Sequence, residues 1–205
     1  QSLNKIIELN IPHVSCYCLT VELETPLYFF IKNGKYPKLN SKTGKEQFLI
    51  ARKMLLKNGY EHYEISNFSQ TGRESLHNQN YWNKTHYLGV GPSAHSFNGK
   101  SRRWNTKNNI QYCEKIETNT VYYETESLTK KNIINEYILT SLRTSSGLDS
   151  DFFLTHMSKK ELKDFHGQLR ALKTSKLINQ TGNKICLTEK GMLLADSISE
   201  DLFLI

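Results

Sequence analysis

The hydrophobic positions at the start of the chain have first a helical and then an alternating spacing. Apolar residues within positions 3–9 recur on one helical face, and Pro12 ends this pattern. The chain opens in the middle of that face and without a methionine, so we expect it to begin inside a helix of a longer protein. Residues 13–22 (HVSCYCLTVE) then alternate and include β-branched side chains, which predicts a strand. A helix followed by a strand is typical of an α/β layer.

Two more helices and a second strand are predicted before residue 70. Residues 25–33 and 42–57 have helical spacing, and an Asn-Gly pair after the second is a typical stop signal. Residues 61–68 (EHYEISNF) predict a strand. The following segment, residues 69–99, has no clear period but contains tyrosine, tryptophan and phenylalanine, which disordered segments lack. We therefore expect this segment to be ordered.

The pattern becomes mainly helical after about residue 125. Three helices are predicted, then a short hairpin and a final helix: residues 128–143, 149–156 and 158–174, strands 176–179 and 183–188, and residues 189–203. This order predicts a winged-helix-like module. We therefore expect two domains, at residues 1–125 and 126–205.

Composition and charge narrow the classes of partner. With 205 residues and 38% hydrophobic content, the chain can bury one larger lobe and a small second domain. The net charge of +7 is spread along the chain, and the helix at 158–174 carries Glu161 and Asp164 among its lysines. This charge pattern is weak evidence for nucleic-acid binding, so a packing role is favoured for the small domain. No apolar run approaches the roughly 20 residues that span a bilayer.

The four cysteines do not have the spacing of a metal clip or of a disulfide framework. They are Cys16, Cys18, Cys113 and Cys186. Reduced thiols in a cytoplasm are the simplest interpretation. Cys16 and Cys18 are predicted to share one face of a strand as small buried side chains.

Four segments, in this order and spacing, carry a resemblance to a known family. They are residues 13–22, residues 62–68 (HYEISNF), residues 74–82 (ESLHNQNYW) and residues 87–96 (YLGVGPSAHS), followed by Arg103-x-Asn105, Leu142-Arg143-Thr144 and Gly147-Leu148. This arrangement resembles the HemW-like radical S-adenosylmethionine (SAM) proteins of the oxygen-independent coproporphyrinogen III oxidase family. The resemblance covers nearly the whole chain.

The resemblance implies an α/β fold, the C-terminal part of an incomplete (β/α) barrel followed by the winged-helix-like domain. It also implies SAM, a 4Fe-4S cluster and heme as cofactors of the full-length parent. The cluster of such proteins is held by a CxxxCxxC motif, which this sequence lacks. We therefore expect that the cluster cannot form here and that the fragment alone is catalytically inactive.

The resemblance places residues 13–22 as the last barrel strand, with Leu19 and Thr20 nearest to SAM. The alternative is that both belong to the packing of the strand, with Leu19 turned inward. Glu64 and Asn67 are polar positions in the YEISNF motif and are candidates for substrate binding. They are equally suited to hold neighbouring loops.

Residues 77–82 combine an imidazole, amides, a phenol and an indole. This set suits a porphyrin, because a neutral histidine nitrogen ligates heme iron and aromatic faces cover the macrocycle. The heme candidates are His77, Asn78, Tyr81, Trp82 and His95, with His77 as the iron ligand. Alternatively, His77 and Asn78 bind loop carbonyls while Tyr81 and Trp82 fill the bottom of the lobe.

His95 lies in the small-residue run 89–96, which allows a ligand to approach the backbone closely or serves tight packing. Ser93 stands where relatives have glycine, so we expect that no glycine-only backbone angle is required there.

Two functions of the parent protein remain open at this stage, with a third of another class. The first is a cytoplasmic heme chaperone that binds heme and delivers it to apo-hemoproteins. The second is oxidative decarboxylation of the propionate side chains of coproporphyrinogen III. The third is nucleic-acid binding by the small domain.

Overall fold

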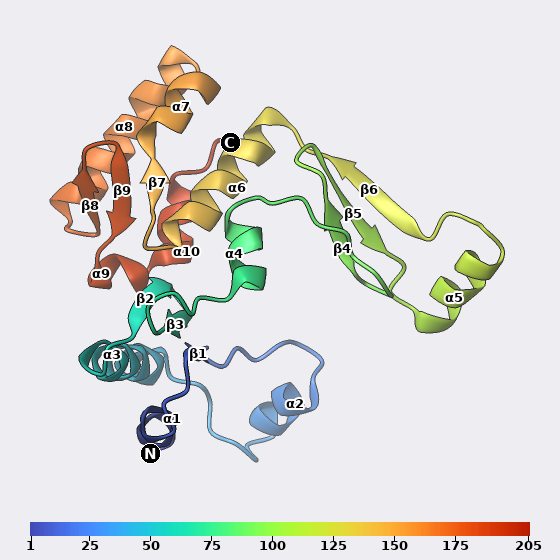
Figure 1. Cartoon of the computed structure of the whole chain (residues 1–205), viewed down its shortest axis with the longest axis horizontal. Helices are drawn as coiled ribbons and strands as arrows, with labels where there is room; N and C mark the ends of the chain where they lie inside the picture. Colours follow the sequence, from blue (N-terminus) through green and yellow to red (C-terminus); the bar gives the residue numbers. More distant parts are fainter. The chain divides into compact units, whose positions relative to one another are not determined.

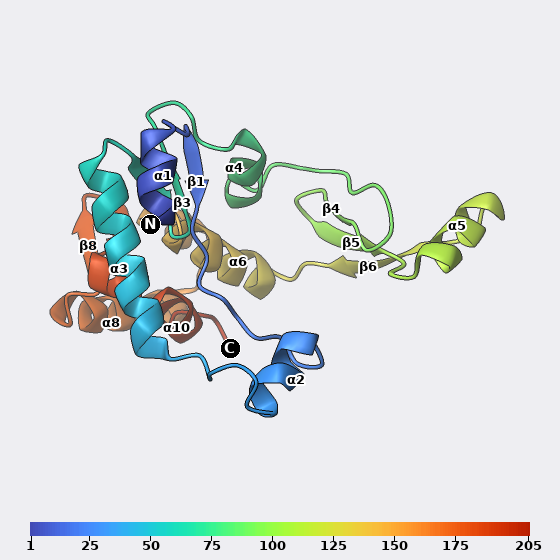
Figure 2. The same cartoon turned by 90° about the horizontal axis from the view of Figure 1, so that it is seen from below.

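The computed structural model describes residues 1–205, which form two compact units, Gln1–Glu74 and Ser75–Ile205 (Figures 1 and 2). The division falls at residue 74, whereas the sequence analysis places a domain boundary near residue 125. That boundary stays a prediction. No helix in the chain combines the length and apolar character that a membrane crossing requires.

The first unit is built on a small antiparallel sheet. Its strands are β1 (His13–Ser15), β2 (Glu61–Glu64) and β3 (Asn67–Ser69), in the order β1-β3-β2. Apolar side chains on helix α1 (Ser2–Glu8) pack against a core made by Val14, Leu55, Tyr60 and Phe68. Burial of these side chains holds the helices to the sheet, at roughly 25 cal/mol for each Å² of apolar surface.

The predicted helices in this unit are confirmed. Helix α2 (Pro26–Lys32) begins after Thr25, whose side chain accepts a hydrogen bond from the Tyr28 N–H. Helix α3 (Ser41–Lys57) ends before an Asn-Gly pair, where Gly59 has a φ of +82° that favours glycine.

The predicted strand at 13–22 is wrong beyond Ser15. β1 pairs antiparallel with the three-residue strand β3, and the Cys16 N–H donates to the Ser66 carbonyl at the end of this ladder. A strand needs backbone partners, so the β-forming residues that follow leave the sheet. Cys16 and Cys18 therefore do not share a strand face.

The predicted strand at 61–68 is a tight hairpin instead. The chain turns between Glu64 and Asn67, and the buried Glu64 carboxylate accepts hydrogen bonds from the Ser66 N–H and the Asn67 side-chain amide. Local bonds from polar side chains compete with a continuing strand, which explains the turn.

The second unit begins with helix α4 and a second antiparallel sheet. Helix α4 (Leu76–Trp82) precedes β4 (His95–Phe97), β5 (Ser101–Asn105), α5 (Asn109–Glu117) and β6 (Tyr123–Ser127). The sheet order is β4-β5-β6, with β5 in the centre. The segment 69–99 is thus ordered, as expected.

The remainder of the second unit is mainly helical. It runs through α6 (Lys130–Leu142), β7 (Leu148–Asp149), α7 (Ser150–His156), α8 (Lys159–Thr174), β8 (Ile178–Thr181), β9 (Lys184–Leu187), α9 (Glu189–Met192) and α10 (Ala195–Asp201). The strands form a sheet in the order β7-β9-β8, and α10 packs on α6. Its core includes Ile134, Ile138, Leu148, Phe153, Phe165, Ile185 and Ile198. The three predicted helices and the hairpin are confirmed.

The single final helix predicted at 189–203 is wrong, because the chain breaks it into α9 and α10. Gly191 in α9 packs so closely on the residue before β8 that a Cβ there would lie 2.0 Å from the Leu177 carbonyl oxygen. The backbone then leaves helical geometry at Leu194, before Ile198 of α10 and Leu202, which directly follows this helix, enter the core. Two different packing surfaces thus require two short helices.

Two glycines next to strands of the β7-β9-β8 sheet allow the effect of packing to be separated from that of backbone conformation. Gly147 and Gly182 both have positive φ, +69° and +60°. A Cβ on Gly147 would lie 2.3 Å from the Ile185 carbonyl oxygen, whereas one on Gly182 meets nothing within 4 Å. We predict that Gly182→Ala costs about 1 kcal/mol of unfolding free energy and Gly147→Ala about 1–3 kcal/mol more. Urea denaturation measures both, and equal costs would contradict the described packing.

His62 makes the stability of the first unit depend on pH. Its ring stacks on Phe68 at 4.1 Å between centroids, and Nε2 lies 2.9 Å from the Ile65 carbonyl oxygen. A carbonyl only accepts, so Nε2 carries the proton and the buried Nδ1 has no partner. Burial lowers the pKa of His62, the Arg52 charge lowers it further, and the hydrogen bond to the Ile65 carbonyl opposes both.

The unfolded chain therefore takes up a proton at His62 before the folded chain does as the pH falls. The contribution of the neutral ring to the free energy of unfolding is fully present above about pH 6.5 and decreases below it. We predict that the thermal midpoint falls less between pH 7.5 and pH 5.5 in His62→Phe, which keeps the stacking but cannot titrate, than in the unchanged protein. Circular dichroism measures both midpoints, and parallel pH profiles would refute this role.

Candidate functional site

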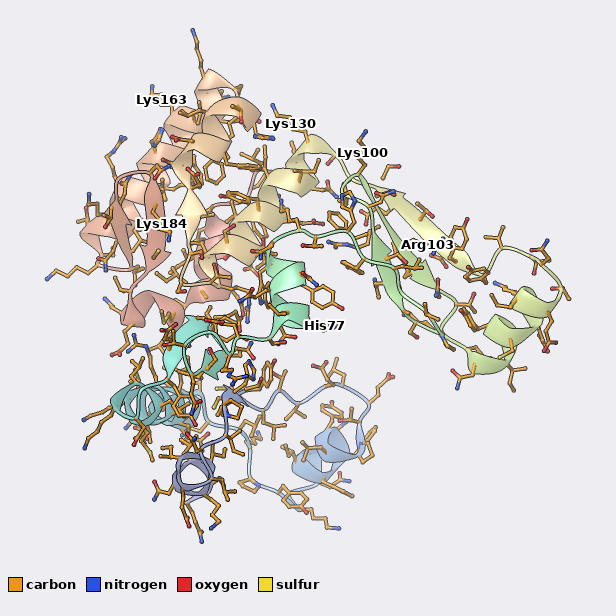
Figure 3. The ribbon with its side chains drawn as sticks, in the orientation of Figure 1. His77, Lys100, Arg103, Lys130, Lys163 and Lys184 are labelled. Carbon is orange, nitrogen blue, oxygen red and sulfur yellow. The ribbon has the colours of Figure 1, made fainter.

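Helix α4 presents a histidine and a tyrosine one turn apart on an exposed face. The Ser75 side chain starts the helix by accepting a hydrogen bond from the Asn78 N–H at 3.2 Å. His77 and Tyr81 then stand at i and i+4, which brings their side chains together. Their rings meet edge to face at 5.2 Å, and His77 Nε2 lies 3.3 Å from the Tyr81 hydroxyl. Figure 3 shows His77 on this helix.

An aromatic series continues from α4 to the β4-β5-β6 sheet. The Tyr81 ring meets Tyr87 edge to face at 5.0 Å, and Tyr87 lies 6.0 Å from Phe97. Tyr87 is fixed beside β4 by two backbone hydrogen bonds with Phe97, of 3.0 and 2.9 Å. Burial raises the pKa of the Tyr87 phenol, which therefore stays neutral. His77, Tyr81 and Tyr87 thus form a series of edge-to-face ring contacts.

Trp82 and Asn78 share this helix but have other surroundings. The Trp82 ring lies 5.7 Å from the Arg143 guanidinium at the end of α6. Its Nε1 is buried without a hydrogen-bond partner. Trp82 and Asn78 are half-buried, whereas His77 and Tyr81 are exposed. The placement of Trp82 suits packing of α4 against α6, and that of His77 suits ligand binding.

His95 is exposed on β4, in the same unit as α4. Its ring lies 6.4 Å from Trp104 on β5. A Cβ at Gly89 would lie 2.1 Å from the His95 carbonyl oxygen, so glycine there serves backbone packing. The expectation for Ser93 is wrong, because its φ of +60° is in the left-handed region. The segment holds Ser93 in this conformation with a backbone hydrogen bond to the Thr106 carbonyl.

Glu64 and Asn67 lie in the first unit and are almost fully buried. The Ser15 hydroxyl donates to Asn67 Oδ1 at 2.7 Å, and the Asn67 amide in turn donates to the Glu64 carboxylate. The network joins β1 to the β2–β3 turn. This placement suits the alternative in which both side chains hold neighbouring loops.

Leu19 and Thr20 lie after the end of β1, in a segment without regular structure. Leu19 is 62% exposed, so the alternative that turned it inward is wrong. Both side chains belong to the first unit and are open to solvent.

The predicted site residues thus fall into separate groups. His77, Asn78, Tyr81 and Trp82 share helix α4, His95 lies on β4, and the remaining four belong to the first unit. No three or more histidine, cysteine, aspartate or glutamate side chains gather as a metal site. Cys16 and Cys186 are half-buried thiols, and burial raises the pKa of each.

Two surface hollows contain residues that the sequence analysis did not single out as a site. One, of about 350 Å³, lies on the β4-β5-β6 sheet and includes Arg103 and Tyr123. The other, of about 430 Å³, lies along α8 and is lined by Lys163, His166, Arg170 and Lys173, with Gln180 of β8. Figure 3 shows Lys163 on α8 and Arg103 on β5.

The spacing of charges along α8 was the missed signal for the second hollow. At about 3.6 residues per turn, Lys159, Lys163, His166, Arg170 and Lys173 fall on one face of α8. Glu161 and Asp164 lie on other sides of the helix, and Glu161 is used by the capping box with Ser158. Mixed charge in the sequence is therefore a basic face in the structure.

Known proteins are similar to this chain in sequence. Residues 128–194 match the model of the HemN C-terminal domain. The chain is 30% identical over 204 residues to the heme chaperone HemW of Lactococcus lactis, covering 100% of this chain and 54% of that protein. It is 29% identical over 199 residues to the heme chaperone HemW of Bacillus subtilis, covering 97% of this chain and 52% of that protein.

A solved structure shares the fold. Coproporphyrinogen III oxidase (HemN) from Escherichia coli, described as a radical SAM enzyme, matches with a TM-score of 0.68 and 21% sequence identity, over 98% of this chain and 50% of that one. The chain spans about half the length of the curated relatives it matches. The resemblance found in the sequence motifs is thus confirmed: the chain is similar over its whole length to HemW heme chaperones, shares the fold of HemN and carries a HemN C-terminal domain at residues 128–194.

Proposed function

We propose that this chain is part of a radical SAM protein of heme metabolism that binds heme and passes it to apo-hemoproteins. The observation that carries the proposal is the exposed His77–Tyr81 pair on α4, in a chain similar over its whole length to heme chaperones. The proposed heme residues are His77, Asn78, Tyr81 and Trp82, with His95 as a second candidate ligand.

The side chains on α4 fit a heme. In the tautomer with the proton on Nδ1, His77 Nε2 accepts from the Tyr81 hydroxyl and has the lone pair that an axial ligand requires. That contact is long, at 3.3 Å, so an incoming ligand displaces it at small cost. Tyr81 and Tyr87 offer ring surface next to it. Bound heme would supply the iron centre that recipient proteins need.

The remaining assignments belong to the same proposal. SAM and a 4Fe-4S cluster are cofactors of the longer protein, in which Leu19 and Thr20 lie near SAM and Glu64 and Asn67 near the substrate. The first unit is then part of an incomplete barrel. The order α6, β7, α7, α8, β8, β9 supports a winged-helix-like domain at residues 126–205. The proposed location is the cytoplasm.

Oxidative decarboxylation of coproporphyrinogen III is the alternative within the same family. The likeness to the Escherichia coli oxidase, at 21% identity, supports the shared fold. The heme chaperones are more similar in sequence, at 29% and 30% identity over nearly all of this chain. We therefore prefer the chaperone function.

Nucleic-acid binding is a second candidate, favoured by the basic face of α8. Lys163, Arg170 and Lys173 line one hollow along this helix, and no carboxylate lines it. A helix with such a face can place cations against phosphates, and β8–β9 stands beside it as a wing.

The heme proposal predicts a specific loss on changing His77. Hemin added to the unchanged protein should give a shifted Soret band, and His77→Ala should weaken binding about tenfold or more, because an axial ligand is lost. His166→Ala, a change of an exposed histidine on α8, is the matched control and should bind as before. His95→Ala tests the second candidate. Spectra that are the same in all four proteins would remove both histidines from the site.

The nucleic-acid candidate predicts binding that weakens steeply with salt. For a labelled duplex, the logarithm of the binding constant should fall linearly with the logarithm of the salt concentration, and Lys163→Gln with Arg170→Gln should reduce that slope by about 2. The control pair is Lys42→Gln with Lys53→Gln on α3. Fluorescence anisotropy measures the slopes, and no binding at 50 mM salt would dismiss this candidate.

A further inference from the structure

The hollow beside β5 is lined by residues of the β4-β5-β6 sheet and of the segments next to it. Arg103 occupies the centre, with Ser96 on β4 and Thr125 on β6 as its direct neighbours across the strands. Tyr123 and Tyr87 also line this hollow of about 350 Å³. We call it the Arg103 hollow.

The guanidinium of Arg103 is held in place but has no anionic partner. It stacks over the Tyr123 ring, with 4.4 Å between the guanidinium carbon and the ring centroid. Its Nε is buried and has no hydrogen-bond partner. Stacking uses the flat face of a guanidinium and leaves the N–H groups at its edge for a ligand.

Strand alternation explains why Arg103 lacks a partner within the chain. Arg102 and Trp104 point to the opposite face, where Arg102 forms an ion pair with Glu136 at 3.0 Å and Trp104 Nε1 donates to Glu124 at 3.1 Å. Glu124 and Glu126 are the cross-strand partners of Trp104 and Arg102, so both lie on that opposite face. The sheet face that carries Arg103 therefore has no carboxylate from β6.

The neighbours of Arg103 decide which anion fits. Serine and threonine hydroxyls add hydrogen-bond donors beside the guanidinium, and tyrosines supply apolar ring surface. Planar, bidentate recognition by arginine suits a carboxylate. An anion carried on a flat apolar body satisfies both kinds of surface.

The Arg103 hollow is joined to α4 through Tyr87. Two ring-to-ring steps, of 5.2 Å from His77 to Tyr81 and of 5.0 Å from Tyr81 to Tyr87, lead from the exposed imidazole to the wall of the hollow. A ligand held by His77 therefore lies two ring contacts from the wall of the Arg103 hollow.

We propose that Arg103 binds a carboxylate of the ligand that His77 holds, which for heme is a propionate. The inference rests on the proposed function for the identity of the ligand, and on the unpaired guanidinium in its hollow for the recognition of a carboxylate. Arg103 then determines which porphyrins are accepted, since an ester cannot form the charged pair.

Binding of acids and esters tests this role. Hemin and hemin dimethyl ester are titrated into the unchanged protein, Arg103→Gln and Arg102→Gln, with absorbance as readout. Arg103→Gln should weaken hemin binding about tenfold or more, as expected for a lost charged hydrogen bond, and leave ester binding unchanged. Arg102→Gln changes the neighbouring arginine on the opposite face and should match the unchanged protein for both ligands. Thermal unfolding verifies that each variant is folded.

The outcomes separate this inference from the proposed function. If the unchanged protein binds hemin through His77 and Arg103→Gln binds it equally well, the inference fails and the function stands. A similar loss for acid and ester makes Arg103 a structural residue and also overturns the inference. Metal-free protoporphyrin IX contains no iron, so its binding, which fluorescence measures, does not require an iron ligand. If protoporphyrin binding depends on Arg103 while hemin binding is unaffected by His77→Ala, Arg103 remains the carboxylate-binding residue and the role of His77 is overturned. No binding of any porphyrin overturns both.

Discussion

Side-chain alternation along β5 is the constraint on which the candidate site depends. Because successive residues of a strand point to opposite faces, Arg102 and Arg103 enter different environments although they are neighbours in the sequence. One face collects the acids of β6 and the ion pair with Glu136, while the other keeps an unpaired guanidinium beside tyrosines and hydroxyls. A register shift of one residue would pair Arg103 with an acid and remove the anion site.

Helical spacing has the corresponding effect on α4. The i and i+4 positions place His77 and Tyr81 together on the exposed side, while Trp82, one residue further, lies against Arg143. The indole thereby anchors the short helix to α6 and leaves the imidazole open to a ligand. Adjacent residues of one motif thus have different surroundings: the position of Trp82 suits packing, and the position of His77 suits the proposed ligand binding.

Much of the fold could be predicted from the sequence, because long periodic segments such as α3 and α8 are bounded by clear caps. The strand at 13–22 could not, since β-forming residues need a partner and β3 offers only three residues. The β2–β3 hairpin was missed because its turn depends on side-chain bonds of Glu64, which do not appear in a hydrophobic pattern. Among the candidate site residues, the α4 motif was singled out by its unusual chemistry. Arg103 was named only as part of a motif, because its lack of a partner depends on the alignment of β5 with β6.

In the proposed function, the exposed imidazole on α4 is an iron ligand for heme. Pulsed electron paramagnetic resonance of the hemin-loaded protein, prepared with ¹⁵N-labelled histidine, measures the hyperfine coupling between iron and a histidine nitrogen most directly. We expect this coupling in the unchanged protein and its loss in His77→Ala. The same coupling in both proteins, or none in the unchanged protein, would contradict it.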